Sequence, residues 1–277
     1  NFSDLSGLFD LNNSEIVGSL ISDNLNLNLR MDQTGFMRIE INDSTIPDIE
    51  FINSSQSTSN ASLNSRLIIK NSSLGKIKIK DFEAYLLNNQ KKFTVNNIKL
   101  NSNLISIKPL KKSSIAYFSI DKVKPLYKIS GDFLIKDSNK IPYLRHFADF
   151  SYFNGSINLQ WKELSTLSHI EGESNFILKD LAINDSISDS LAFNLLGVLN
   201  LRNILGKLAN LDLSIDEYIS TQLSRVEGDL LFSKSKLRLA SPLFIETNAA
   251  KMKWVGQINK NSKNNLDELD LNLDLRI

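Results

Sequence analysis

The chain is dominated by stretches in which apolar and polar residues alternate, the pattern that places successive side chains on opposite faces of a β-strand. In residues 24–31, Leu25, Leu27 and Leu29 share one face, while asparagines occupy the other. The same alternation returns at residues 76–80, 156–161, 211–216, 236–240 and 269–277. Strands with one polar face are typical of antiparallel sheets, so we predict a mainly β protein in which one sheet face is dry.

Polar turn clusters separate these stretches, and the longest of them, at residues 53–60, is a candidate boundary. Two segments break the strand pattern and predict short amphipathic helices. Tyr143, Phe147 and Phe150 recur at helical spacing after Pro142. A stronger helix is predicted near residues 189–208, and its apolar stripe comprises Leu191, Leu195, Val198, Leu201, Leu205 and Leu208. We expect this helix either to pack on the sheet or to gate its apolar face.

Composition is that of an ordered protein, with 42% hydrophobic and 23% charged residues in 277. The net charge is only +1, but residues 66–140 hold 16 basic and 5 acidic residues, a local balance of +11. Two interpretations stay open: a basic surface that faces anionic lipid headgroups, or solvated strand faces that use lysine. Because these residues are nearly all Lys and lack regular aromatic interleaving, we expect no nucleic-acid partner.

Residues that would support catalysis or metal binding are sparse in the sequence. There is no cysteine, and the two histidines, His146 and His169, lack the spacing of paired metal ligands. No phosphate-binding glycine motif or nucleophile-elbow motif occurs. We therefore expect no enzyme, no metal and no cofactor. The chain begins at Asn1 without a signal-like segment, so we expect a fragment of a longer protein.

The order of elements after residue 128 resembles the C-terminal part of bacterial AsmA-like envelope proteins of the YhdP/TamB type. A strand ending in Trp161 precedes a glycine-led strand from Gly172 to Leu178, and a leucine-rich helix segment follows at Leu195–Leu201. Then come the pair Gly228 and Asp229, an alternating strand, the pair Ser241 and Pro242, and a strand through Gly256 before the last alternating strand. The resemblance covers residues 129–277, whereas residues 1–128 share only the general style of amphipathic strands.

The resemblance implies an elongated, twisted antiparallel sheet that forms a hydrophobic groove for phospholipid transfer between the inner and outer membranes. It also implies a periplasmic location in a Gram-negative bacterium, with the full-length protein anchored in the inner membrane and contributing to outer-membrane biogenesis. We accordingly expect residues 1–128 to supply amphipathic strands of the groove and residues 129–277 to form the AsmA-like C-terminal region with the helix near 189–208. Its partners are then phospholipid acyl chains and membrane surfaces at the ends of the full-length protein.

The inward-facing apolar residues of the alternating stretches are the candidate groove residues. They are Leu25, Leu27, Leu29, Ile77, Ile79, Ile157, Leu159, Trp161, Phe176, Leu178, Leu237, Leu239, Leu271 and Leu273. A carrier must cover acyl chains whose exposure to water costs roughly 0.8 kcal/mol per CH₂, and one dry sheet face can provide that cover. The alternative is a structural or adhesive all-β envelope protein whose dry face is filled by its own side chains.

Overall fold

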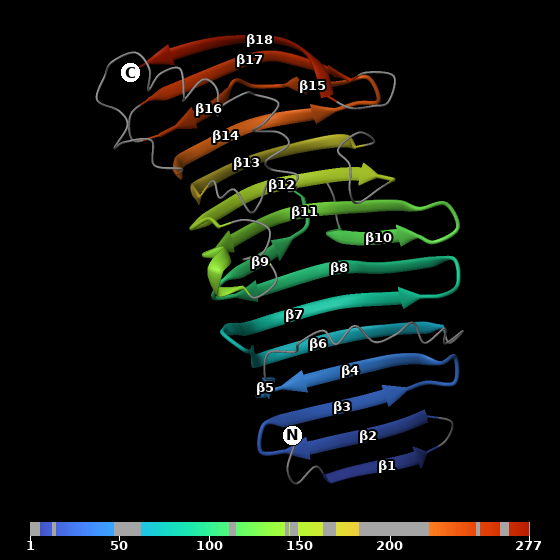
Figure 1. Cartoon of the computed structure of the whole chain (residues 1–277). Coiled ribbons are helices and arrows are strands. Elements are labelled where there is room, and N and C mark those ends of the chain that lie inside the picture. The colour runs from blue at the N-terminus through green and yellow to red at the C-terminus, as the bar shows by residue number, and fades with distance from the viewer. Residues whose placement is uncertain are drawn as a thin grey trace. The chain divides into compact units, whose positions relative to one another are not determined.

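The computed structural model is mainly β, as the alternation predicts (Figure 1). It describes residues 6–12, 15–46, 62–110, 115–141, 144, 149–162, 170–182, 222–247, 250–260 and 266–276. Within these residues most of the chain is in β-strands and there is no α-helix. The chain divides into two compact units, Asn1–Asp132 and Phe133–Ile277, which are described separately below. From the sequence, a division was expected after residue 128.

The first unit is a sheet whose strands mostly follow one another along the chain (Figure 1). β1 to β4 form an antiparallel meander, and β6, β7 and β8 form a second one. β8 also pairs with β9 and β10, and β10 pairs with β11, which contains the point of division. The strands are β1 (Ser6–Asn12), β2 (Glu15–Ser22), β3 (Leu25–Met31), β4 (Phe36–Asn42), β5 (Thr45–Ile46), β6 (Leu63–Leu74), β7 (Ile77–Asn88), β8 (Lys92–Ser102), β9 (Ile105–Lys108), β10 (Tyr117–Asp121) and β11 (Leu126–Lys136).

The two meanders meet through parallel pairing, which the alternation did not predict. β4 and β5 both run parallel to β6, with Ile39 beside Leu67 and Ile41 beside Ile69. Parallel neighbours cannot be joined by a two-residue hairpin and need a longer crossover connection. The polar cluster at residues 53–60 lies between these strands in the sequence, outside the described residues. Alternation reports which face a residue occupies, and it carries no information about strand direction.

Two bends lie side by side in neighbouring strands of this unit. Asp43 and Asn71 both have a φ of 47°, and each is followed by a buried serine, Ser44 or Ser72. Each serine hydroxyl donates a hydrogen bond of 2.8 Å to the carbonyl oxygen two residues earlier, and the Ser72 Oγ accepts the N–H of Ser44 at 3.1 Å. Asn and Asp tolerate left-handed backbone better than other residues with a side chain. The two left-handed residues therefore lie at the same level of neighbouring strands.

The second unit is antiparallel throughout its described pairs. Its strands are β12 (Tyr152–Trp161), β13 (Glu171–Ala182), β14 (Gln222–Phe232), β15 (Lys236–Leu239), β16 (Leu243–Glu246), β17 (Lys251–Lys260) and β18 (Leu266–Arg276), with the 3-10 helix η1 (Ser138–Lys140) before them. β15 and β16 both pair with β14 on one side and β17 on the other. They correspond to one strand that is interrupted at Ser241 and Pro242, because proline has no backbone N–H to donate to a neighbouring strand.

The apolar face of the second unit is a packed core. Leu223, Leu237, Met252 and Ile258 are each 1% exposed, and Ile245 is fully buried. The whole buried cluster comprises Phe150, Leu181, Leu223, Val226, Leu230, Leu237, Leu243, Ile245, Met252, Trp254 and Ile258. Gly228 allows β14 to approach β16, since a Cβ at this position would lie 2.8 Å from the Leu243 Cδ1.

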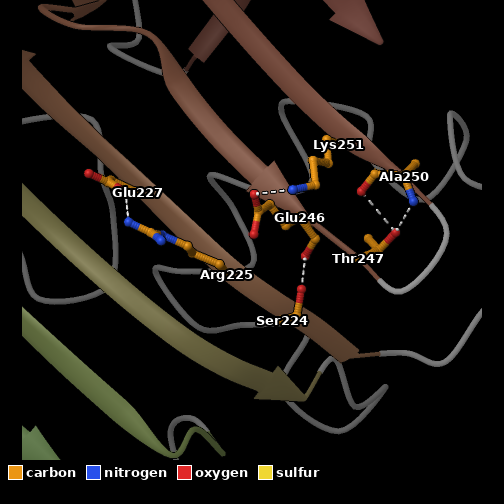
Figure 2. Close-up of polar contacts among 7 residues, drawn as sticks. All are labelled: Ser224, Arg225, Glu227, Glu246, Thr247, Ala250 and Lys251. Atoms are coloured by element: carbon orange, nitrogen blue, oxygen red, sulfur yellow. Dashed lines mark hydrogen bonds and ion pairs between the residues drawn. The ribbon is translucent and has the colours of Figure 1, made fainter. Parts of the chain in front are cut away.

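The opposite face of the second unit mixes polar residues with the exposed Phe244, and Figure 2 shows some of the polar contacts in this part of the chain. The Lys251 ammonium lies 3.2 Å from the Glu246 carboxylate, and the Ser224 hydroxyl donates to the Glu246 carbonyl at 2.9 Å. Arg225 forms an ion pair with Glu227 on the same strand. Such partly exposed ion pairs contribute no more than about 1 kcal/mol each, so the apolar cluster dominates the stability of this unit.

The helix predictions fall largely outside the described residues. The segment near 189–208, with Leu191, Leu195, Val198, Leu201, Leu205 and Leu208, lies wholly outside them, as do Tyr143 and Phe147. Phe150 is described: it is 8% exposed, lies outside any helix, and belongs to the apolar cluster. Its backbone N–H donates to the Ser138 hydroxyl at 2.8 Å, which ties this residue to η1.

Candidate functional site: an open apolar face

Strand register in the first unit aligns apolar side chains into rows that cross the strands. Along one row each residue is the direct pairing partner of the next, and each is only partly buried. This row contains Leu20, Leu27, Ile41, Ile69, Phe82, Leu100 and Ile107. Since it takes one residue from each of β2, β3, β4, β6, β7, β8 and β9, the apolar surface is continuous across neighbouring strands.

Two further rows lie on the same face. One contains Ile16, Met31, Met37, Ser65, Leu86, Val95, Phe118 and Ile129, and the other Gly18, Leu29, Ile39, Leu67 and Ala84. Apart from the glycine, Ser65 and Ala84, these side chains are partly exposed. The closest backbone contacts among the described strands here run between sheet neighbours. We call the three rows together the open apolar face.

The other face of the same strands is polar and carries ion pairs. The Arg66 guanidinium lies 2.8 Å from the Glu83 carboxylate and 5.4 Å from the centre of the Tyr85 ring. Arg38 pairs with Glu40 on β4. These residues occupy the positions that alternate with the open apolar face, so this face is mainly polar, although the apolar Ile68 of β6 is also buried on it.

Most predicted groove residues are partly buried, but they are distributed between two different surroundings. Leu25, Leu27 and Leu29 lie on β3 in the first unit, and Leu27 and Leu29 belong to the open apolar face. Leu237 lies instead inside the packed cluster of the second unit, where it has almost no exposed surface. The remaining partly buried candidates of the second unit are Ile157, Leu159, Trp161, Phe176, Leu178 and Leu239.

Four further predicted groove residues belong neither to the aligned rows nor to the buried cluster of the second unit. Ile77 is partly buried and Ile79 is 8% exposed, and a register irregularity between Ile79 and Asp81 separates both from the aligned rows. Leu273 is 36% exposed opposite Trp254. The backbone of Leu271 pairs with Gly256, and its side chain is outside the described residues.

Several residues of the open apolar face were absent from the sequence-based candidates. They are Leu20, Met37, Ile39, Ile41, Leu67, Ile69, Phe82, Leu100 and Ile107. Alternation was present in residues 36–42, so β4 could have been included. The stretch at residues 67–69 contains consecutive apolar residues, and alternation could not show that Ile68 faces away from Leu67 and Ile69.

Titratable groups in the described residues show few perturbations. The Thr34 hydroxyl, at 2.6 Å, is the main cause that holds the pKa of Asp32 below its usual range. Among the described residues no group of three or more His, Cys, Asp or Glu side chains is placed to hold a metal ion. His146 and His169 lie outside these residues. The described part of the chain also contains no helix with the length and apolar character needed to span a membrane.

Comparison with known proteins returned no matching family model, no matching curated protein and no matching solved structure. Function is therefore inferred from the chemistry of the two sheet faces. The open apolar face consists of aliphatic and aromatic side chains, Gly18 and Ala84, and Ser65 is its one residue with a side-chain hydroxyl.

Proposed function

We propose that the chain binds phospholipid acyl chains along the open apolar face and supports their transfer through a hydrophobic β groove. The observation that carries this proposal is the row from Leu20 to Ile107, in which every side chain is apolar and only partly buried. A sheet that needed this face only for its own core would bury it, as the second unit does. The AsmA-like resemblance adds a setting to the proposal: transport of phospholipid between the inner and outer membranes from the periplasm, with no chemical step.

The dimensions of the row suit an acyl chain. Neighbouring strands lie about 4.8 Å apart, so the row from β2 to β9 extends about 29 Å. One leaflet of a bilayer supplies roughly half of a ~30 Å hydrocarbon core. The row is therefore long enough for a single acyl chain to remain covered while it moves from strand to strand. Each CH₂ that stays in contact avoids roughly 0.8 kcal/mol of exposure to water.

The packed cluster of the second unit favours a different role for that part of the chain. Leu237, Ile245 and Met252 are almost completely buried, so their own side chains offer no surface to a ligand. This is the filled core that the structural alternative predicts, so we propose that the C-terminal strands of this unit act as scaffold. The lipid-binding role is then assigned to the first unit.

Matched substitutions on β3 test the proposal. Leu27→Asp places a carboxylate in the row between Leu20 and Ile41, whereas Asn28→Asp adds the same charge on the opposite, exposed face. Loss of contact with three or four CH₂ groups costs about 3 kcal/mol, or roughly 100-fold in affinity. Native mass spectrometry after incubation with phospholipid vesicles should show bound lipid in the parent chain and in Asn28→Asp, and little in Leu27→Asp. Absence of lipid from the parent chain, or equal loss in both variants, would refute the proposal.

A further inference from the structure

Two hairpin turns of the first unit meet at one end of its strands. The β7–β8 turn spans residues 88–92 and the β10–β11 turn spans residues 121–126 (Figure 1). The Lys122 ammonium donates to the Asn88 side-chain oxygen at 2.6 Å and to the Asn89 carbonyl at 2.9 Å. The Lys122 backbone N–H also donates to the Lys91 carbonyl at 2.8 Å. These bonds hold the two turns together as one feature, which we call the lysine tip.

The lysine tip is strongly basic. It contains Lys91, Lys92, Lys122 and Lys124, all of them exposed, against one carboxylate, Asp121. That carboxylate accepts the backbone N–H groups of Val123 at 2.9 Å and Lys124 at 3.1 Å. These hydrogen bonds, Lys124 first, lower the pKa of Asp121, and the charges of Lys92 and Lys124 add to the effect. Four cations therefore face one anion whose hydrogen-bonding capacity is largely used inside the turn.

An apolar residue lies among these lysines, in the β10–β11 turn. Val123 is 66% exposed and lies between Lys122 and Lys124. An exposed aliphatic side chain flanked by lysines suits the boundary between headgroups and acyl chains, where the side chain enters the apolar region and the ammonium groups stay at the phosphates. A soluble polyanion offers no apolar layer for Val123, so the pairing of the two features favours a membrane over a nucleic acid.

The tip is also adjacent to aromatic residues of the apolar side of the sheet. Phe93 pairs with Ile120, and Ile120 pairs with Tyr127, in the last rows before the two turns. The Phe93 and Phe118 rings pack edge to face with their centres 6.4 Å apart. Of these residues Tyr127 combines an apolar ring with a polar hydroxyl, which is the kind of side chain preferred where hydrocarbon meets water. The exposed lysines of the tip and an apolar surface thus lie next to each other along β8, β10 and β11.

We infer that the lysine tip docks onto an anionic membrane surface, with Val123 inserted and the lysines against lipid phosphates. This docking does not depend on lipid entering the open apolar face. It adds a contact by which the first unit would meet a bilayer.

Vesicle flotation with the complete chain tests this inference. The probes are vesicles of phosphatidylcholine alone and vesicles with 30 mol% phosphatidylglycerol. Each lysine near an anionic surface contributes about a fivefold gain in affinity, so the triple variant Lys91→Ser, Lys92→Ser, Lys124→Ser should bind anionic vesicles on the order of 100-fold more weakly. Val123→Ser, which keeps all charges, should lose about tenfold. The loss from the triple lysine variant should be absent with phosphatidylcholine vesicles, and binding to the anionic vesicles should weaken with added salt.

The matched control removes the same charge from the other end of β7. Lys76, Lys78 and Lys80 are exposed and lie roughly 26 to 40 Å along the strand from the tip. Their triple serine variant should keep nearly full binding. Equal loss in both triple variants would show that only net charge matters and would overturn the inference. So would binding to a short DNA duplex as tight as to anionic vesicles and equally reduced by Val123→Ser.

Bound lipid in native mass spectrometry tests the groove proposal, whereas vesicle flotation tests the docking inference. Leu27→Asp should leave vesicle flotation unchanged while it removes bound lipid in native mass spectrometry. The lysine variants should keep lipid delivered from detergent solution, because they leave the open apolar face intact. A chain that floats with anionic vesicles yet never retains a lipid would refute the groove proposal and would leave the docking inference intact.

Discussion

Replacement of single leucines by alanine should lower the free energy of unfolding more in the buried cluster of the second unit than on the open apolar face. Leu237 is 1% exposed and packs between Phe232 on β14 and Ile258 on β17. Leu237→Ala removes fully buried atoms and leaves a cavity, which costs about 3 kcal/mol. Leu239 lies two residues further along β15 on the same face and is partly exposed, so Leu239→Ala should cost about 1 kcal/mol. Leu29→Ala on the open apolar face should cost about the same as Leu239→Ala.

The assay uses the natural distribution of tryptophan. The chain has two tryptophans, Trp161 and Trp254, and both belong to the second unit. Tryptophan fluorescence during urea unfolding therefore reports on that unit, while far-ultraviolet circular dichroism follows the strands of both. With a urea dependence of about 2 kcal/mol per M, Leu237→Ala should lower the fluorescence midpoint by roughly 1.5 M and Leu239→Ala by roughly 0.5 M. Leu29→Ala should shift only the dichroism signal, by a similar small amount.

The three variants should differ in the size of their midpoint shifts. A midpoint shift for Leu29→Ala as large as that for Leu237→Ala would mean that the open apolar face is as tightly packed as the cluster. In that case the partly exposed rows would not offer surface to a ligand. A small shift for Leu237→Ala would show that the cluster contributes little to stability, contrary to its burial.

Two further predictions concern turns and close approaches. Gly172 has a φ of 126° and a Cβ there would lie 2.1 Å from the Asn158 carbonyl oxygen, so Gly172→Ala should strongly lower the tryptophan-detected midpoint; Gly35→Ala, with a φ of 78° and no atom within 4 Å, should cost only about 1 kcal/mol. Because Asp32 has a lowered pKa, its contribution to stability is present above the usual value of 3.8 and is lost as the pH falls through the lower folded-state value. Thr34→Val should raise the NMR titration midpoint of Asp32, and an unchanged midpoint would contradict the assignment of Thr34 as the main cause.

Local alternation was sufficient to predict individual strands. Residues 24–31 were expected as a strand and form β3 (Leu25–Met31), and residues 156–161 lie within β12. The period of two reflects a geometric property of each strand by itself, so it needs no knowledge of the neighbours. The mainly β class followed from the same property.

Pairing direction and burial depend on distant residues and could not be predicted in this way. Leu27 and Leu237 occupy similar alternating stretches, yet one is partly exposed and the other is buried in the cluster. The bends at Asp43 and Asn71 had a weak signal, Asn or Asp followed by serine, which also occurs widely in turns. Only the pairing of β4 with β6 brings these two bends to the same level and gives them a structural meaning.

The rows of the open apolar face restrict the class of side chain and leave its identity free. Leu, Ile, Met, Val and Phe all occur at these positions, and exchanges among them would preserve an apolar surface because these side chains are only partly buried and packing constrains their shape less. Selection acting on such a surface would permit rapid sequence divergence while strand register stayed constant. Two homologous sheets of this kind would then be recognised more readily by the spacing of their apolar positions than by the number of identical residues.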